Sequence, residues 1–232
     1  MGIAAPIFAF LFLAFGQCRF AVGNENQLQY LALGDSYTIG ESVPVAANFP
    51  NQAARLLRAE GLPFADPRIV AKTGWTTDEL RSAIEEAATH DPFLTKYELV
   101  TLLIGVNDQY RGRPVSEYEG EFRELLQRSI QFAGGDKGHV IVLSIPDWGV
   151  TPFAEGRDRQ RIANEIDEYN RANAVISSEM DVHYLSITHW TREAGNEQSL
   201  LAADGLHPSG KEYARWAGKI TGLVVSMYRP AR

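Results

Sequence analysis

Short apolar runs alternate with longer stretches of helical spacing along this chain of 232 residues. The runs are rich in leucine and β-branched residues, and each has about the length of one buried strand. They occupy residues 28–33, 68–71, 98–104, 139–145 and 182–187. Strands that alternate with helices form parallel sheets whose two faces are covered by the helices. The alternation therefore predicts an α/β fold, a three-layer sandwich around a five-stranded parallel sheet.

The stretches between the runs show where helices lie and where some of them begin. Residues 116–132, 158–180 and 209–228 carry apolar side chains at steps of three to four residues, which is typical of a helix with one buried face. A serine or threonine followed three residues later by glutamate forms a capping box, because the two residues bind each other's N–H groups. We expect such boxes at Thr76 with Glu79, Ser116 with Glu119, and Ser209 with Glu212.

Charge and composition exclude some classes of partner. The net charge is -7 and the chain has no basic run, which argues against nucleic acid and against docking on anionic membranes. Hydrophobic residues make up 45% and charged residues 22%, as in an ordinary globular domain. We therefore expect one domain over residues 24–232, a small-molecule partner and no stable protein partner.

The N-terminal segment differs from the rest of the chain. The sequence "MGIAAPIFAFLFLAFG" carries no charged side chain, and its apolar core has the length of a signal-peptide core rather than of a bilayer span. Residues 1–23 are thus predicted to be a signal peptide or an N-terminal anchor, and the protein to be exported, periplasmic or secreted. No Lys or Arg precedes the apolar core, so a buried N-terminal helix stays open as an alternative. Cleavage would also remove Cys18 and leave no cysteine for a disulfide.

Polar clusters follow the predicted strands at the points where the strands end. Gly34-Asp35-Ser36 follows the first strand, Gly74 the second, and "GVND" (105–108) the third. A further cluster, "DGLHPSG" (204–210), directly precedes the last predicted helix. Ligands of open parallel sheets bind beyond the carboxyl ends of the strands, so we expect these clusters to meet there.

These residue types suit acyl transfer. The hydroxyl of Ser36 is a weak nucleophile unless a base takes its proton, and His207 is the best-placed histidine for that role. Asp204 lies three residues earlier and can orient the imidazole. The N–H groups of Ser36 and Gly74 and the side-chain amide of Asn107 can bind a developing oxyanion. His189 is a lesser candidate for the base.

The blocks "GDSYTIG", "TG" before a helix, "GVND" and "DGLHPSG" resemble, in this order, the SGNH hydrolase superfamily of GDSL esterases and lipases. The resemblance covers nearly all of residues 28–228. It implies a flavodoxin-like three-layer fold with Ser36 as nucleophile, His207 as base and Asp204 as its acid. It also implies an oxyanion hole made by Ser36, Gly74 and Asn107. Tyr37 stands where the family usually has leucine, a position that shapes the pocket.

The resemblance implies a serine esterase that forms an acyl-enzyme and uses neither a cofactor nor a metal. Its substrate would be a short acyl ester, an acetylated carbohydrate or a lysophospholipid. An acyltransferase on the same fold is one alternative, and a non-catalytic binding protein on this fold is another. A metal-dependent phosphoesterase is a third, because Asp35, Asn107, Asp108 and His207 include hard-metal ligands.

Two further groups of residues near the strand ends have open interpretations. Arg111 and Arg113 are either contacts for a charged leaving group or members of a solvated loop. The aromatic residues near the strand ends either line the substrate site or belong to the core. They are Tyr37, Trp75, Tyr110, Trp148 and Trp190.

Overall fold

The computed structural model of the chain describes Met1 and residues 27–229. These residues form a sheet of five parallel strands in the order β2-β1-β3-β4-β5. The strands are β1 (Tyr30–Asp35), β2 (Arg68–Lys72), β3 (Leu99–Leu103), β4 (Val140–Leu143) and β5 (His183–Leu185). The α/β fold and the five-stranded parallel sheet that the sequence predicts are confirmed.

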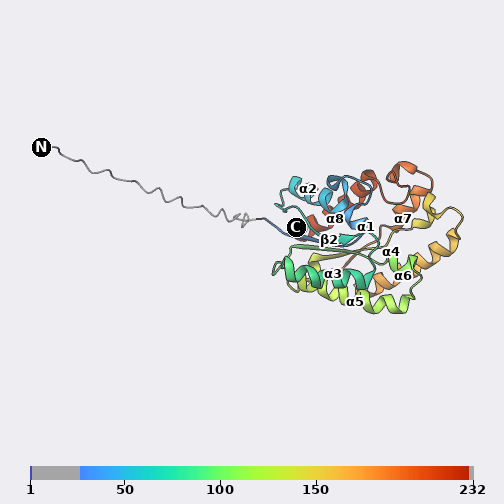
Figure 1. The fold of residues 1–232 in the computed structure, drawn as a ribbon, viewed down its shortest axis with the longest axis horizontal. Helices are drawn as coiled ribbons and strands as arrows, with labels where there is room; N and C mark the ends of the chain where they lie inside the picture. The colour runs from blue at the N-terminus through green and yellow to red at the C-terminus, as the bar shows by residue number, and fades with distance from the viewer. Residues whose placement is uncertain (2–26, 230–232) are drawn as a thin grey trace.

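Helices cover both faces of the sheet, so the molecule has three layers (Figure 1). Helices α2 and α8 lie on one face, and α3, α5 and α6 lie on the other. The α-helices are α1 (Ser36–Ile39), α2 (Phe49–Ala59), α3 (Thr77–His90), α4 (Val106–Tyr110), α5 (Val115–Phe132), α6 (Arg159–Glu179), α7 (Thr188–Thr191) and α8 (Gly210–Tyr228). Short 3-10 turns η1 (Val45–Ala47), η2 (Lys137–His139), η3 (Trp148–Val150), η4 (Pro152–Ala154), η5 (Arg192–Gly195) and η6 (Gln198–Leu200) connect them.

The sheet register brings distant segments to one edge. All residues of β1 are buried, because β1 pairs with β2 on one side and with β3 on the other. Gly34 lies opposite Ala71 of β2 and Leu103 of β3, so the loops that follow the three strands emerge side by side. The strand order changes direction at β1, since β2 lies on one side of it and β3 on the other. In such a fold the crevice lies between the carboxyl ends of β1 and β3.

The predicted helix starts are only partly correct. Thr76 and Glu79 form the expected capping box of α3. Ser209 caps α8, but the carboxylate of Glu212 binds Trp216 and Arg215 instead of completing a box.

The capping box predicted at Ser116 is wrong. Helix α5 begins at Val115 after Pro114, so Ser116 lies inside its first turn. Proline favours the start of a helix because its φ angle is already helical and it needs no N–H acceptor. The apolar spacing did not indicate helix α2. Asn48 caps the start of this helix, because its side chain accepts from the N–H of Asn51.

The predicted signal peptide or anchor, residues 1–23, lies outside the described residues except for Met1. Its removal, and export of the protein, stay predictions. No helix within residues 27–229 is long and apolar enough to cross a bilayer.

Candidate active site

Ser36 lies where β1 turns into α1. The side chain of Asp35 caps this helix by accepting from the N–H of Tyr37 at 3.0 Å. Gly34 is required for close packing, because a Cβ there would lie 2.2 Å from Oγ1 of Thr38 and 2.3 Å from the carbonyl oxygen of Leu103. Ser36 begins the helix, so its N–H has no acceptor within the helix. The tight turn thus holds the Ser36 hydroxyl at the crevice.

His207 and Asp204 lie beside Ser36 although they are 171 and 168 positions away in the chain. Nε2 of His207 lies 2.9 Å from Oγ of Ser36, and Nδ1 lies 2.7 Å from Oδ2 of Asp204. Oδ1 of Asp204 accepts from the N–H groups of Leu206 and His207 at 3.0 Å each. The ring of Tyr37 packs against the imidazole with a centroid separation of 4.9 Å. The three predicted residues therefore form one hydrogen-bonded chain.

The Asp204 carboxylate is held in its ionised form. Partial burial opposes ionisation, but hydrogen bonds from Ser42, His207 and the two N–H groups outweigh it and lower the pKa of Asp204 to about 2. Ser42 is a member of the site that sequence reasoning missed. Its hydroxyl donates to Oδ2 of Asp204 at 2.7 Å, across 162 positions of chain.

Gly74 and Asn107 line the same cleft as Ser36 and His207. Gly74 has a φ of 86°, a conformation that glycine adopts without strain. Arg111 donates to the carbonyl oxygen of Gly74 at 2.7 Å, and Nδ2 of Asn107 donates to the carbonyl oxygen of Trp75 at 2.9 Å. The N–H of Gly74 donates to no acceptor within residues 27–229. Nδ2 of Asn107 also donates to Oδ2 of Asp35, at a long 3.5 Å. The N–H of Gly74 is thus available to an oxyanion.

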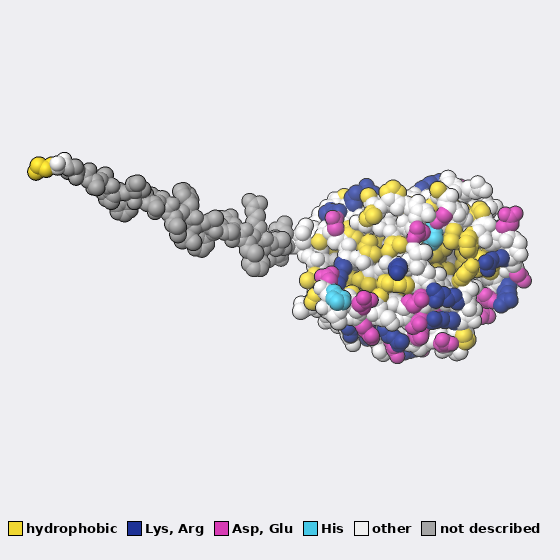
Figure 2. Space-filling view, viewed as in Figure 1, with side chains coloured by type: hydrophobic (Ala, Val, Ile, Leu, Met, Phe, Trp, Pro, Cys, Tyr) yellow, Lys and Arg dark blue, Asp and Glu magenta, His cyan; other side chains and the backbone are white. Residues whose placement is uncertain are grey.

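A small, mostly apolar cleft opens over these groups. Its volume is about 160 Å³, and Ser36, His207, Gly74 and Asn107 line it together with an aromatic rim. We define the aromatic rim as Tyr110, Trp148 and Phe153. Tyr110 and Phe153 are 44% and 45% exposed, and the guanidinium of Arg157 lies 5.2 to 5.9 Å from the centroids of the three rings. Figure 2 shows hydrophobic patches on both sides of a histidine and an acidic side chain on one face.

The other candidates from the sequence lie in different surroundings. Tyr37, Tyr110 and Trp148 line the cleft, whereas Trp75 and Trp190 pack against the core. His189 is exposed and packs against Trp190, with ring centroids 4.7 Å apart. Sequence reasoning missed Phe153 and Leu206, which also line the cleft. Phe153 lies outside every motif, and Leu206 lies within "DGLHPSG", where only the polar residues had been given a role.

The carboxyl groups of Asp35 and Asp108 are buried and lie close enough for Asp108 to influence Asp35. Burial, with a smaller contribution from Asp108, raises the pKa of Asp35 to about 8 against the hydrogen bond from Tyr37. Burial also raises the pKa of Asp108 to about 6, although Thr77 and Arg113 oppose the shift. Asp108 accepts from the N–H and the hydroxyl of Thr77 and thereby ties α3 to α4.

The carboxyl groups of Asp78, Asp108 and Glu121 converge as the ligands of a cation would. A guanidinium nitrogen of Arg113 lies 2.7, 3.3 and 3.5 Å from them, so an arginine of the chain supplies the positive charge. Arg111 forms an ion pair with Glu79. Both arginines thus pair with carboxylates, but the side chain of Arg111 is 44% exposed whereas that of Arg113 is 22% exposed. Asp35, Asn107, Asp108 and His207, the metal ligands considered from the sequence, each bind other partners.

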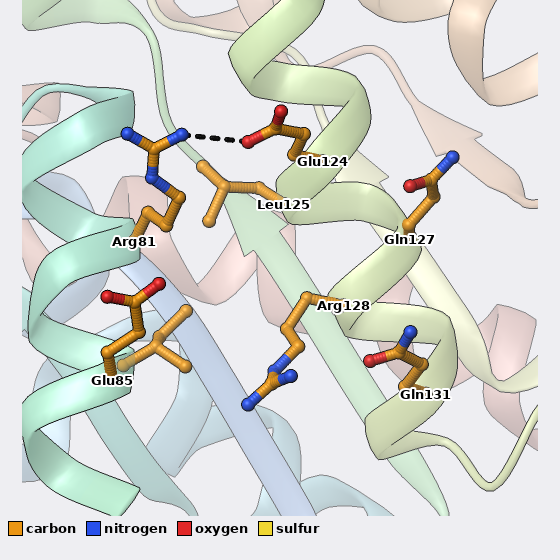
Figure 3. A pocket seen from close by; sticks show the side chains of 8 residues that line it. Arg81, Glu85, Glu124, Leu125, Gln127, Arg128 and Gln131 are labelled. Atoms are coloured by element: carbon orange, nitrogen blue, oxygen red, sulfur yellow. Dashed lines mark hydrogen bonds and ion pairs between the residues drawn. The ribbon is translucent and has the colours of Figure 1, made fainter.

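A second hollow, the α3–α5 groove, shares no residue with this cleft. It is lined by Arg81 and Glu85 of α3 and by Glu124 and Arg128 of α5, and Arg81 binds Glu124 across it (Figure 3). These side chains form ion pairs at the surface and contain no nucleophile with an adjacent base. The cleft at Ser36 is therefore the candidate active site.

Comparison with known families assigns the chain to a family. The sequence model of the GDSL-like lipase/acylhydrolase family matches residues 32–215. The match begins within β1 and ends within α8, so it includes Ser36, Gly74, Asn107, Asp204 and His207. No curated protein matches the chain.

Solved structures share the fold at low sequence identity. The lipase/acylhydrolase from Enterococcus faecalis is 20% identical with a TM-score of 0.65, over 89% of this chain and 100% of that one. An acetylxylan esterase from Geobacillus stearothermophilus is 21% identical with a TM-score of 0.63, over 85% and 94%. The psychrotrophic esterase EstA from Pseudoalteromonas sp. is 15% identical with a TM-score of 0.63, over 86% and 98%.

Proposed function

The chain belongs to the GDSL-like lipase/acylhydrolase family and is a carboxylic ester hydrolase, and from this premise we propose that it is a serine esterase with Ser36 as nucleophile. His207 takes the proton of Ser36 while the serine oxygen bonds to the ester carbonyl carbon. The protonated His207 then donates to the departing alcohol, which leaves an acyl group on Ser36. Water, deprotonated by His207, attacks this acyl-enzyme and releases the acid.

The observation that carries the proposal is the unbroken chain from Ser36 through His207 to Asp204, at 2.9 and 2.7 Å. A carboxylate at Nδ1 fixes the tautomer in which Nε2 is free to accept the serine proton, and it stabilises the imidazolium that results. The lowered pKa of Asp204, about 2, keeps this carboxylate ionised at neutral pH.

The tetrahedral intermediate carries a negative oxygen that needs donors. We assign this task to the N–H groups of Ser36 and Gly74 and to the side chain of Asn107. The loss of one such donor typically slows the reaction ~10²–10³-fold.

Short acyl esters, with acetylated carbohydrates first among them, fit this site best. A cleft of about 160 Å³ is small beside the ~300–1,000 Å³ of sites for drug-sized ligands, so a long acyl chain is disfavoured. The half-exposed rings of Tyr110 and Phe153 offer flat apolar faces to a sugar ring next to the ester. The structural relative named as an acetylxylan esterase has this type of substrate. Export by residues 1–23 would bring the enzyme to extracellular polysaccharide.

A chain-length series tests the proposal. We expect p-nitrophenyl acetate to be hydrolysed with a higher kcat/KM than the octanoate or palmitate, and Ser36→Ala to abolish the activity. A fluorophosphonate probe should label the wild type at Ser36 and leave Ser36→Ala unlabelled. Equal hydrolysis by the two proteins would overturn the proposal. Activity that EDTA abolishes and a divalent ion restores would favour the metal-dependent alternative.

A further inference from the structure

Ser42 lies in the turn that follows α1 and contacts the far end of the proposed triad. Its hydroxyl donates at 2.7 Å to Oδ2 of Asp204, the same oxygen that binds Nδ1 of His207 at 2.7 Å. The segment that follows Ser36 therefore contacts the same carboxylate oxygen as the imidazole does.

The backbone at Ser42 is in an unfavourable conformation for serine. Its φ is 64°, in the left-handed region that residues other than glycine seldom adopt. The turn is held by hydrogen bonds from the N–H groups of Gly40 and Glu41 to the carbonyl oxygen of Ser36, at 3.1 and 3.0 Å. The side chain of Asn48 adds a bond to the carbonyl oxygen of Ile39 at 2.9 Å. Strain at a site of this kind is retained where it serves a function.

We propose that Ser42 is a positioning residue that holds the Asp204 carboxylate in line with His207, an inference that rests on the proposed esterase function. Asp204 has two oxygens to restrain. The N–H groups of Leu206 and His207 fix Oδ1, and Ser42 fixes Oδ2. Without Ser42 the carboxylate keeps its backbone bonds but can rotate about them, so Oδ2 leaves the plane of the imidazole.

Removal of the hydroxyl also changes how well the protonated His207 is stabilised. A carboxylate in line with Nδ1–H stabilises an imidazolium, and a carboxylate that has rotated away stabilises it less. The imidazolium becomes harder to form, so kcat falls and the acid limb of the pH profile moves to lower pH. Asp204 acts electrostatically on the titratable side chains of Tyr37 and Tyr213. Asp35, Glu41 and Asp147 also act on one or both of these tyrosines. Burial raises the pKa of both tyrosines above its ordinary value, so they stay neutral across that limb.

The test compares Ser42→Ala with Ser42→Gly. Both variants lack the hydroxyl, but glycine relieves the backbone strain that alanine retains. We expect kcat to fall about tenfold in both variants with KM unchanged, since a hydrogen bond to a charged group is worth roughly that factor or more. The acid limb of kcat/KM should move to lower pH in both. Thermal stability should differ, with the glycine variant above the alanine variant.

A double-mutant cycle identifies the group through which Ser42 acts. In an Asp204→Asn background, Ser42→Ala should cause little further loss, because its target has been removed. Ser226→Ala, an exposed serine on α8, is the matched control and should leave the kinetics unchanged.

Two results would overturn the inference without touching the proposed function. One is a wild-type kcat and pH profile in both Ser42 variants while Asp204→Asn is impaired. The other is a loss in Ser42→Ala that Ser42→Gly recovers, which would assign residue 42 a purely backbone role. Failure of the proposed function has a different signature, namely activity that does not depend on Ser36.

Discussion

Asp35 and Asp204 are both close to the Ser36–His207 pair, but their surroundings differ. Asp35 directly precedes Ser36 in the chain, and Asp204 is hydrogen-bonded to His207. Asp35 is 1% exposed at the end of the central strand and accepts from the N–H of Tyr37. The side chain of Asp204 is 28% exposed on a loop and accepts from Ser42, His207 and two backbone N–H groups.

The pKa of each carboxyl group follows its donors and its burial rather than its distance from the nucleophile. The pKa of Asp35 rises to about 8 and that of Asp204 falls to about 2. At neutral pH Asp35 is therefore mostly a neutral carboxylic acid that caps α1, while Asp204 is a carboxylate that can stabilise an imidazolium. Asp35 thus supports the structure, and Asp204 supplies the electrostatic stabilisation.

The strongest test of this division exchanges each carboxyl group for an amide. Asp204→Asn should lower kcat roughly 10³–10⁴-fold, because the amide favours the wrong tautomer of the histidine. Asp35→Asn should lower kcat less than about tenfold, since asparagine also caps helices well. The measurement is kcat on p-nitrophenyl acetate near neutral pH, with thermal unfolding as the control for folding. Equal losses in the two variants would break the comparison.

The dependence of the unfolding free energy on pH tests the same comparison between Asp35 and Asp204. A raised pKa means that the protonated Asp35 is preferred in the folded state. Its contribution is fully present below the unfolded pKa of 3.8 and is lost as the pH rises toward about 8. Asp35→Asn removes this dependence, so its unfolding free energy relative to wild type should increase between pH 4 and pH 8. The increase should be a few kcal/mol, at ~1.4 kcal/mol per pKa unit. A constant difference across this range would show that Asp35 is ionised in the folded protein.

The contrast between the two aspartates also shows what the sequence could predict. The five strands lie where leucine and β-branched residues cluster, and α5, α6 and α8 lie where apolar side chains recur at helical spacing. In a parallel sheet the carboxyl ends of β1, β2 and β3 lie at one edge. This could be predicted without any side-chain contact being known. Ser36, Gly74 and Asn107 could therefore be assigned to one edge from their positions alone.

Features that depend on contacts between distant segments could not be predicted in this way. Ser42 binds a residue 162 positions away, and its own neighbours show only a turn. Asp35 and Asp204 have the same side chain, and only the folded chain determines which one is buried. The capping box at Ser116 failed for a local reason, because Pro114 starts the helix earlier than the serine would.

A smaller effect is expected from Arg113, which faces a carboxylate with a pKa between those of Asp35 and Asp204. Arg113 lies 3.3 Å from the fully buried Asp108 and 2.7 Å from Asp78. Arg113→Gln should lower the unfolding free energy by about 1–3 kcal/mol at pH 8, because a buried charge loses its partner. The loss should be smaller at pH 5, below the Asp108 pKa of about 6, where that group is largely protonated. A loss that is independent of pH would assign the effect to packing alone.

The smallest effect is expected in the α3–α5 groove (Figure 3), where charged side chains pair in solvent. Arg81 and Glu124 lie 2.8 Å apart, but their side chains are 44% and 60% exposed. Water screens such a pair, so Glu124→Gln should change the unfolding free energy by less than about 0.5 kcal/mol and leave kcat unchanged. Arg81→Gln is the matched control and should behave alike, because the buried Ile84 and Leu125 maintain the packing of the two helices. A loss above about 1 kcal/mol in either variant would show that exposure does not separate the weak ion pairs of this protein from the strong ones.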